Sequence, residues 1–180
     1  GTGVFTIAAP NGNTNRTITL PDEAGTLLST ATPGVPIGGP AFSAYQSAAQ
    51  TITSSTGTKV RFQTKEFDTN ACFDATTNYR FTPTVAGYYQ VTSSMFFNLG
   101  VTALSTSIQI FKNSSTVKSV NTGTTSANGW FTPNITALIY MNGSTDFLEV
   151  YIIQYSGAAQ NLTASANTTY FQAALVRSAT

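Results

Sequence analysis

Seven carboxylate side chains in this sequence could act in general acid–base catalysis: Asp22, Glu23, Glu66, Asp68, Asp74, Asp146 and Glu149. A glycoside hydrolase needs two carboxyl groups that face one cleft. Glu66 and Asp68 alternate along one face of an expected strand and form the best pair. Asp146 and Glu149 are three residues apart, which puts them on opposite faces of a strand. Because carboxylates are usually exposed, solvated or turn positions are the favoured interpretation.

The chain contains no histidine, which excludes Ser-His-Asp and Cys-His catalysis built from its own residues. It also lacks the most common transition-metal ligand. The single cysteine, Cys72, is expected to be a small buried strand residue. Asp68, Asp74 and Asp146 offer oxygen ligands for calcium, but no dense acidic loop surrounds them. We therefore predict a non-enzyme without catalytic residues, bound metal or cofactor.

The charge pattern excludes further classes of partner. Charged residues make up 8% of the chain and the net charge is +1, with no basic stripe, so nucleic acid is not an expected partner. No apolar stretch reaches about 18 residues, so no membrane-spanning helix is predicted. Thr, Ser, Asn and Gly provide most of the polar surface.

The composition favours strands. The 12 Phe and 8 Tyr, together with many Val, Ile and Thr, suit a pleated, half-buried surface. Turn signals such as Thr82-Pro83-Thr84 and Asn142-Gly143-Ser144 separate short apolar runs. The strands are expected near 42–45, 59–65, 71–74, 79–82, 86–97, 106–112, 116–121, 130–141, 146–155 and 168–176. This many strands at short spacing indicates an all-β sandwich, barrel or jelly roll.

Three regions divide the chain. Residues 1–29 contain two or three short strands, which cannot bury a core alone and must pack on copies of themselves or on a neighbour. Residues 30–40 hold three prolines and three glycines within ten residues, and we interpret them as a linker. Residues 41–180 form the main domain.

The strand from Phe147 to Tyr155 is apolar on both faces. One face of a sheet in a two-layer sandwich normally points outward. A second apolar face therefore favours a partner subunit that covers it. A strand buried within one chain remains an alternative, because short apolar runs do not distinguish the two.

The order of motifs from Ala41 to Val176 resembles the C1q-like head, a relative of the tumour-necrosis-factor jelly roll. The opening Ala41-Phe42-Ser43-Ala44 and the later Phe81-Thr82-Pro83 with Ala86-Gly87-Tyr88-Tyr89 carry the resemblance. It implies a ten-strand jelly roll that assembles as a tight homotrimer. Its inner sheet would hold the strands at 41–45, 87–97, 146–155 and 168–176. The implied trimer interface contains Phe42, Tyr89, Phe147, Tyr151, Ile153 and Tyr170.

The first segment resembles a short module of bacteriophage tail fibres. The similarity lies in Gly3-Val4-Phe5-Thr6-Ile7 and in the run from Arg16 to Leu27, which contains Thr-Ile-Thr-Leu-Pro-Asp. Fibre module, linker and trimeric head together favour an extracellular virion tail fibre, of which this chain is expected to be a C-terminal piece. Other tail or virion proteins and a host-cell surface glycan or protein are the implied partners.

Two polar loops are candidates for receptor contact. The first precedes Trp130 and includes Asn128, and the second begins at Asn161 shortly after Tyr155. Loops on a rigid sandwich commonly carry binding residues, and an aromatic side chain can stack on a sugar. A core aromatic that begins a strand is the alternative for Trp130.

Four functional hypotheses follow. The leading one is a trimeric fibre tip that attaches to a host-cell receptor, with a glycan as the expected ligand. The alternative is a purely structural trimerising cap or connector of a virion appendage. A polysaccharide depolymerase would need the paired acids described above. A secreted cytokine-like or collagen-headed protein is disfavoured, because the chain lacks Gly-x-y repeats.

Overall fold

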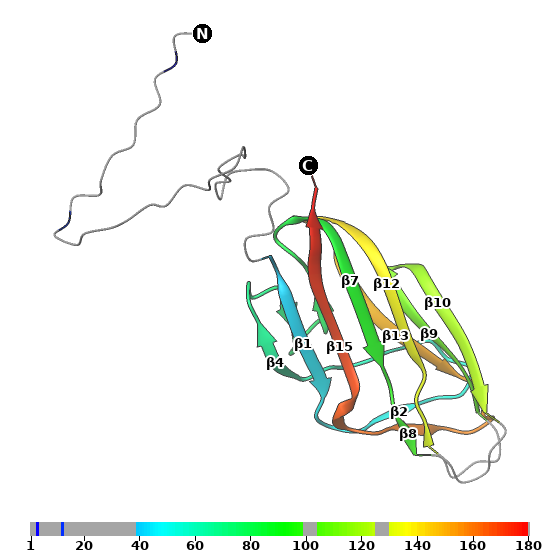
Figure 1. Cartoon of the computed structure of the whole chain (residues 1–180). Coiled ribbons are helices and arrows are strands. Elements are labelled where there is room, and N and C mark those ends of the chain that lie inside the picture. The colour runs from blue at the N-terminus through cyan, green and yellow to red at the C-terminus, as the bar shows by residue number, and fades with distance from the viewer. Residues whose placement is uncertain (1–2, 4–11, 13–38, 99–103, 125–129, 180) are drawn as a thin grey trace, which may run out of the picture.

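The computed structural model describes residues 3, 12, 39–98, 104–124 and 130–179 (Figure 1). These residues form no helix, and accordingly none that could span a membrane. The predicted modules at 1–29 and 30–40 lie almost entirely outside the described residues and stay predictions. The strands are β1 (Ala41–Gln46), β2 (Gln50–Ile52), β3 (Thr58–Lys59), β4 (Thr64–Asp68), β5 (Phe73–Asp74), β6 (Arg80–Phe81), β7 (Ala86–Ser94), β8 (Phe97–Asn98), β9 (Leu104–Lys112), β10 (Ser115–Thr124), β11 (Trp130–Phe131), β12 (Asn134–Asn142), β13 (Leu148–Gln154), β14 (Gln160–Leu162) and β15 (Ser165–Ser178).

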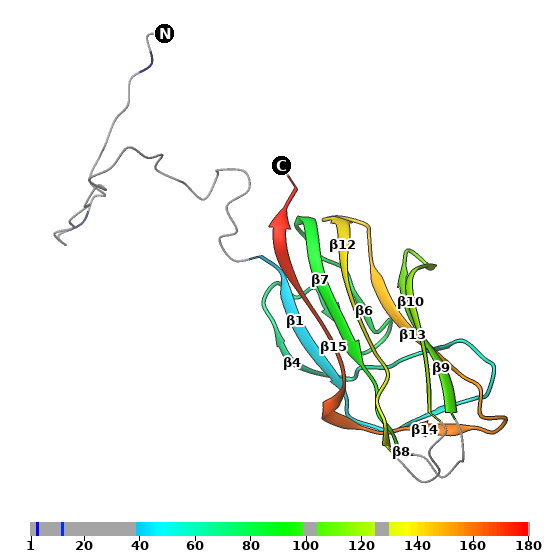
Figure 2. The same cartoon turned by 45° about the vertical axis from the view of Figure 1, so that its right-hand side comes forward.

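Two antiparallel sheets form the sandwich, which confirms the predicted all-β class. One sheet has the order β12-β7-β15-β1-β4, and the other has the order β10-β9-β13-β6-β5, with β3 beside β13. Figure 2 shows the two layers from the side. A third sheet, β11-β8-β14-β2, lies at one end of the sandwich.

Aromatic rings fill the space between the two large sheets. Phe42 stacks on Phe73 and Phe81 with centroid distances of 4.5 and 4.8 Å, and meets Phe171 edge-on at 5.0 Å. Phe81 in turn contacts Tyr89 edge-on at 5.3 Å. Such pairs stabilise a core by about 0.5–1.5 kcal/mol each beyond their burial. This cluster joins β1, β7 and β15 of one sheet to β5 and β6 of the other.

The motif from Phe81 to Tyr89 carries the chain from one sheet to the other. Phe81 ends β6 and Tyr89 lies in β7, with both side chains fully buried. The Tyr89 hydroxyl donates a hydrogen bond to the Val85 carbonyl at 2.7 Å, which satisfies it inside the core. A Cβ at Gly87 would lie 2.4 Å from the Arg177 carbonyl oxygen, so only glycine allows β7 to approach β15 this closely.

Both ends of the domain meet at one end of the sandwich. The Leu175 amide donates to the Pro40 carbonyl at 3.1 Å, and the Ala179 amide donates to the Ala86 carbonyl at 2.9 Å. The four short strands of the third sheet lie at the opposite end (Figures 1 and 2). We call that opposite end, formed by β2, β8, β11 and β14, the distal end.

Candidate functional site

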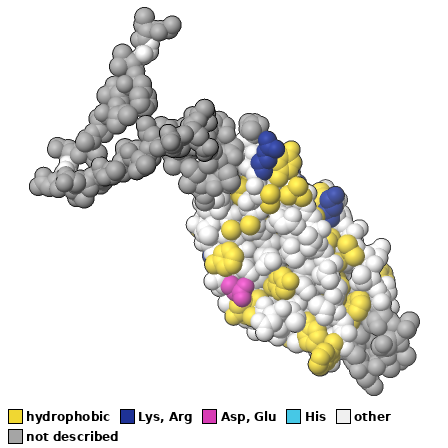
Figure 3. All heavy atoms as spheres, in the orientation of Figure 1, with side chains coloured by type: hydrophobic (Ala, Val, Ile, Leu, Met, Phe, Trp, Pro, Cys, Tyr) yellow, Lys and Arg dark blue, Asp and Glu magenta, His cyan; other side chains and the backbone are white. Residues whose placement is uncertain are grey.

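The outward face of the five-stranded sheet carries separate hydrophobic side chains among neutral polar ones and few charged groups, one of which is Arg177 beside Tyr88 (Figure 3). It holds five of the nine large hydrophobic side chains that are exposed among the described residues. Neutral Gln90, Thr92 and Gln172 separate them and line a shallow hollow beside Phe67. We call this surface the sheet face; its large side chains are Tyr45, Phe67, Tyr88, Leu138, Tyr140, Tyr170 and Val176.

The sheet face is partly pre-organised by contacts within the chain. The rings of Tyr88 and Tyr140, on neighbouring strands, lie 5.5 Å apart. Lys112 lies 5.5 Å from the Tyr140 ring and donates to the Tyr140 carbonyl at 2.8 Å. Glu66, beside Phe67, accepts a hydrogen bond from the Ser43 hydroxyl at 2.6 Å. A rigid aromatic surface of this kind is typical of a protein interface.

The structure corrects two of the predicted interface residues, Phe42 and Tyr89. Both side chains are fully buried between the sheets of a single protomer and are therefore inaccessible to another copy. Tyr88, the neighbour of Tyr89, points outward instead, because side chains alternate along β7. Tyr170 does lie on the sheet face, between the buried Thr169 and Phe171.

The second correction concerns the strand that was expected to be apolar on both faces. β13 pairs with β9, β3 and β6 in the other large sheet, so Phe147, Tyr151 and Ile153 are not on the sheet face.

The chain itself covers part of the outer side of β13. Lys59 reaches Glu149 at 2.7 Å, the Phe111 ring lies 4.2 Å from the Tyr151 ring, and the Arg80 guanidinium lies 4.4 Å from the Phe147 ring. The single-chain alternative therefore accounts for part of the cover on this strand, because Tyr151 and Ile153 are only half-buried.

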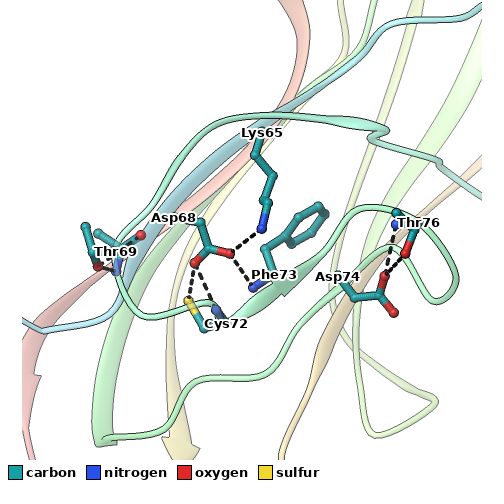
Figure 4. Close-up of polar contacts among 8 residues, drawn as sticks. Lys65, Asp68, Thr69, Cys72, Phe73, Asp74 and Thr76 are labelled. Atoms are coloured by element: carbon teal, nitrogen blue, oxygen red, sulfur yellow. Dashed lines mark hydrogen bonds and ion pairs between the residues drawn. The ribbon is translucent and has the colours of Figure 1, made fainter.

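The Asp68 carboxylate holds the loop between β4 and β5 together (Figure 4). It accepts hydrogen bonds from the Cys72 amide and thiol at 2.9 and 3.2 Å and from the Phe73 amide at 3.1 Å, and it pairs with Lys65 at 3.1 Å. Burial by itself raises the pKa of this carboxyl group, but the hydrogen bonds from Cys72, Phe73 and Lys65 outweigh it, and the pKa lies below its usual value.

Asp74 closes the next turn in the same way. It accepts backbone hydrogen bonds from Thr76, Thr77 and Asn78 at 2.9 to 3.0 Å, and those from Thr77 and Thr76 are the main cause that lowers its pKa. Both members of the expected pair thus have structural partners, since Glu66 accepts from Ser43 of the adjacent β1 and Asp68 holds its own loop.

The remaining described acids also have structural partners. Asp146 pairs with Lys112 at 2.8 Å and accepts hydrogen bonds from Asn113 and from the Asn142 amide. Burial opposes the lowering of its pKa, and these partners outweigh burial. Within residues 39–98, 104–124 and 130–179, no three carboxylate or thiol groups come together to hold a metal ion.

The thiol of Cys72 is buried, as the sequence predicts, but the residue directly precedes β5 and does not lie in a strand as expected. Burial, with the adjacent Asp68 carboxylate as a second cause, raises the pKa of the thiol to about 12. Reactive cysteines have lowered pKa values and are accessible, and Cys72 has neither property.

Three of the predicted receptor residues lie at or beside the distal end. Trp130 begins β11 with 80% of its surface exposed, Asn161 is exposed on β14, and the exposed Tyr155 directly follows β13. Asn128 lies outside the described residues. Asn161 was expected in a loop, and this is wrong, because β14 pairs with β2 and β8.

Sequence reasoning did not identify Thr51 and Asn98, which belong to the same small sheet. Thr51 lies opposite Asn161, and Asn98 lies opposite Trp130. β2 and β14 are short, polar and 110 residues apart at this pair, so neither hydrophobic alternation nor a turn signal indicates them. The expected strand at 86–97 ends at Phe97, and nothing in the sequence indicates that Asn98 belongs to a separate short strand.

Comparison with solved structures decides the fold. Murine APRIL superposes with a TM-score of 0.55 at 12% sequence identity, over 77% of this chain and 100% of that chain. The fold is a TNF-like jelly roll. Eiger TNF from S. frugiperda gives a TM-score of 0.57 at 11% identity, over 83% of this chain and 96% of that chain.

A viral protein has the same TNF-like fold. The phage PRD1 vertex protein P5 gives a TM-score of 0.52 at 15% identity, over 77% of this chain and 99% of that chain. No protein-family model and no curated protein sequence matches this chain. At these identities the likeness describes the fold of the head.

Proposed function

We propose that this chain is the head of a virion tail fibre, a homotrimer that attaches to a glycan receptor on the host-cell surface. The observation that carries the proposal is the position of Trp130, which is exposed at the end opposite both ends of the domain. A fibre joined at the end that holds Pro40 would point the distal end away from the particle.

The sheet face supports the assembly part of the proposal. Apolar residues that would be costly to leave in water gather on one sheet, whereas the opposite large sheet carries fewer exposed ones. The likeness to TNF-like folds favours a trimer over a dimer, and the tail-fibre-like first segment together with the likeness to a phage vertex protein favours a virion. Three weak sites on each trimer would strengthen attachment through avidity.

All described side-chain carboxylates make structural contacts within the chain. This supports a head that does not catalyse a reaction. A structural connector without receptor contact is the second candidate, and the likeness to a vertex protein is the observation that favours it.

Adsorption of the fluorescently labelled protein to a panel of bacterial strains tests the proposal. We expect saturable adsorption to at least one strain, competed by excess unlabelled protein, without release of reducing sugar. A folded trimer that adsorbs to no strain would contradict attachment and favour the connector. Reducing sugar released by the wild type and lost in Glu66→Gln would instead indicate a depolymerase.

A further inference from the structure

We infer that the receptor glycan is an uncharged oligosaccharide that lies along four side chains of the distal end. This inference rests on the attachment function proposed above and specifies its ligand. The four side chains are Trp130, Asn98, Asn161 and Thr51, one from each strand of the small sheet, and we call them the distal row.

The register of the small sheet brings the four residues into line. Trp130 pairs with Asn98, and Asn161 pairs with Thr51. The antiparallel pairing of Leu162 with Phe97 places Asn161 opposite Asn98 in the same ladder. In the next row across the sheet, Phe97 and Leu162 are fully buried. Because side chains alternate between the two faces along a strand, the distal row faces outward.

Trp130 supplies an apolar platform for a sugar ring. A tryptophan with 80% of its surface in water is unusual for a side chain of this size. Phe96 meets its ring edge-on at 6.2 Å and restricts its orientation. An oriented aromatic face suits the apolar C–H face of a pyranose, and the indole N–H can still donate a hydrogen bond.

Asn98, Asn161 and Thr51 supply the polar part of the site. An amide side chain offers both donors and an acceptor, which matches sugar hydroxyl groups that do the same. The Thr51 hydroxyl donates to the Asn161 side-chain oxygen at 2.9 Å, which fixes the amide so that its NH₂ group remains available. Three strand spacings of about 4.8 Å give the row a length of about 14 Å, which suits an oligosaccharide rather than one sugar.

The four strands of the distal end carry no charged side chains, and this indicates which class of sugar they can bind. β2, β8, β11 and β14 contain no Asp, Glu, Lys or Arg. A sialic or uronic acid would lose water around its carboxylate without meeting a cation from these strands. The distal row therefore favours neutral hexoses and N-acetylhexosamines.

Binding of the whole chain to an array of neutral and acidic oligosaccharides tests the inference. We expect binding to neutral members that is insensitive to salt, because no ion pairs form. Trp130→Ala should weaken that binding at least about tenfold, as loss of a central aromatic does at other interfaces. Trp130→Phe should retain most of it. Asn98→Asp should weaken it, whereas Asn121→Asp, a matched change at an exposed position of β10, should leave it unchanged.

The outcomes separate the inference from the proposed function. Cell adsorption that survives Trp130→Ala, or binding restricted to acidic sugars, would overturn the neutral-glycan inference and leave attachment standing. A trimer that binds neither cells nor any arrayed sugar would overturn both. Circular dichroism and solution mass show whether each variant keeps its fold and assembly.

Discussion

At the scale of single residues, buried and half-buried acids stabilise turns in this molecule. Asp68 and Asp74 each accept several backbone hydrogen bonds next to positions with positive φ, at Ala71 and Tyr79. A carboxylate that neutralises several amide donors can hold such strained backbone in place. Glu66 and Asp68 were the candidate catalytic pair in the sequence, but in the structure Glu66 accepts from Ser43 and Asp68 accepts from its own loop.

The pH dependence of stability should follow these carboxyl groups. The pKa values of Asp68, Asp74 and Asp146 are lowered in the folded state, so they stabilise it above their unfolded pKa and lose that contribution as pH falls through the folded values. Since the chain has no histidine, the unfolding free energy should be constant from about pH 5 to 8 and fall below about pH 4.

Chemical denaturation at several pH values, with Asp68→Asn as the variant, measures this dependence. The variant should be less stable at neutral pH by about 1–3 kcal/mol and should show a shallower loss of stability in acid. A transition between pH 6 and 7, or a gain of stability in acid, would contradict this assignment.

The thiol of Cys72 should be inert in the folded protein. With its pKa raised to about 12, almost no thiolate exists at neutral pH, and the side chain is buried. We expect iodoacetamide to alkylate Cys72 at least about 100-fold more slowly in the native than in the urea-unfolded protein. Mass spectrometry measures the alkylation rate. Equal rates in the native and the unfolded protein would show that the loop between β4 and β5 opens freely.

Side-chain direction was the hardest property to predict at this scale. Tyr88 and Tyr89 are adjacent aromatic residues, and a one-residue change of register exchanges which of them faces the core. The close approach of Gly87 to β15 and the hydrogen bond from Tyr89 to Val85 set the register. Neither contact can be read from the local sequence.

At the scale of elements, long strands could be predicted and the short polar ones of the distal end could not. The expected strands at 106–112 and 116–121 correspond to β9 and β10, each slightly longer than expected. The expected strand at 130–141 is divided into β11 and β12 near Pro133, whose carbonyl accepts from the Met95 amide. The distal row depends on strands paired across most of the chain, which no local pattern reveals.

Turn geometry gives a prediction at this scale. Gly143 and Gly157 both have positive φ, of 71° and 81°. A Cβ at Gly143 would lie 2.2 Å from the Ala86 amide nitrogen, whereas a Cβ at Gly157 would meet nothing within 4 Å. Gly157→Ala should therefore cost about 1 kcal/mol of unfolding free energy for backbone strain, and Gly143→Ala about 3 kcal/mol or more, because it also displaces the start of β7. Equal costs in urea denaturation would contradict the close packing of this turn.

At the scale of the whole molecule, the two ends and the sheet face have different proposed roles. Pro40 and Ala179 lie at one end of the sandwich and the distal row lies at the other, and the proposed function uses the sheet face for assembly. The TNF-like fold could be expected from the motif order, because Phe81, Pro83 and Gly87 lie together where the chain crosses from β6 in one sheet to β7 in the other. The placement of β13 required the complete topology, since its apolar pattern fits either sheet.

Two valines provide a matched test of the sheet face. Val176 on β15 is 54% exposed within the sheet face, and Val120 on β10 is 37% exposed on the other large sheet. Val176→Asp should bury three carboxylates inside the proposed interface, where their loss of water outweighs any pairing with the adjacent Arg177, and dissociate the assembly, whereas Val120→Asp should not. Both variants should keep the fold, because each side chain is exposed within the protomer.

Light scattering during size exclusion is the measurement that tests the central claim most directly. We predict a wild-type species of three times 19.0 kDa, retained in Val120→Asp and reduced to the monomer mass in Val176→Asp. A wild-type protein that stays monomeric at all concentrations, or a trimer that Val176→Asp leaves intact, would contradict assembly through the sheet face.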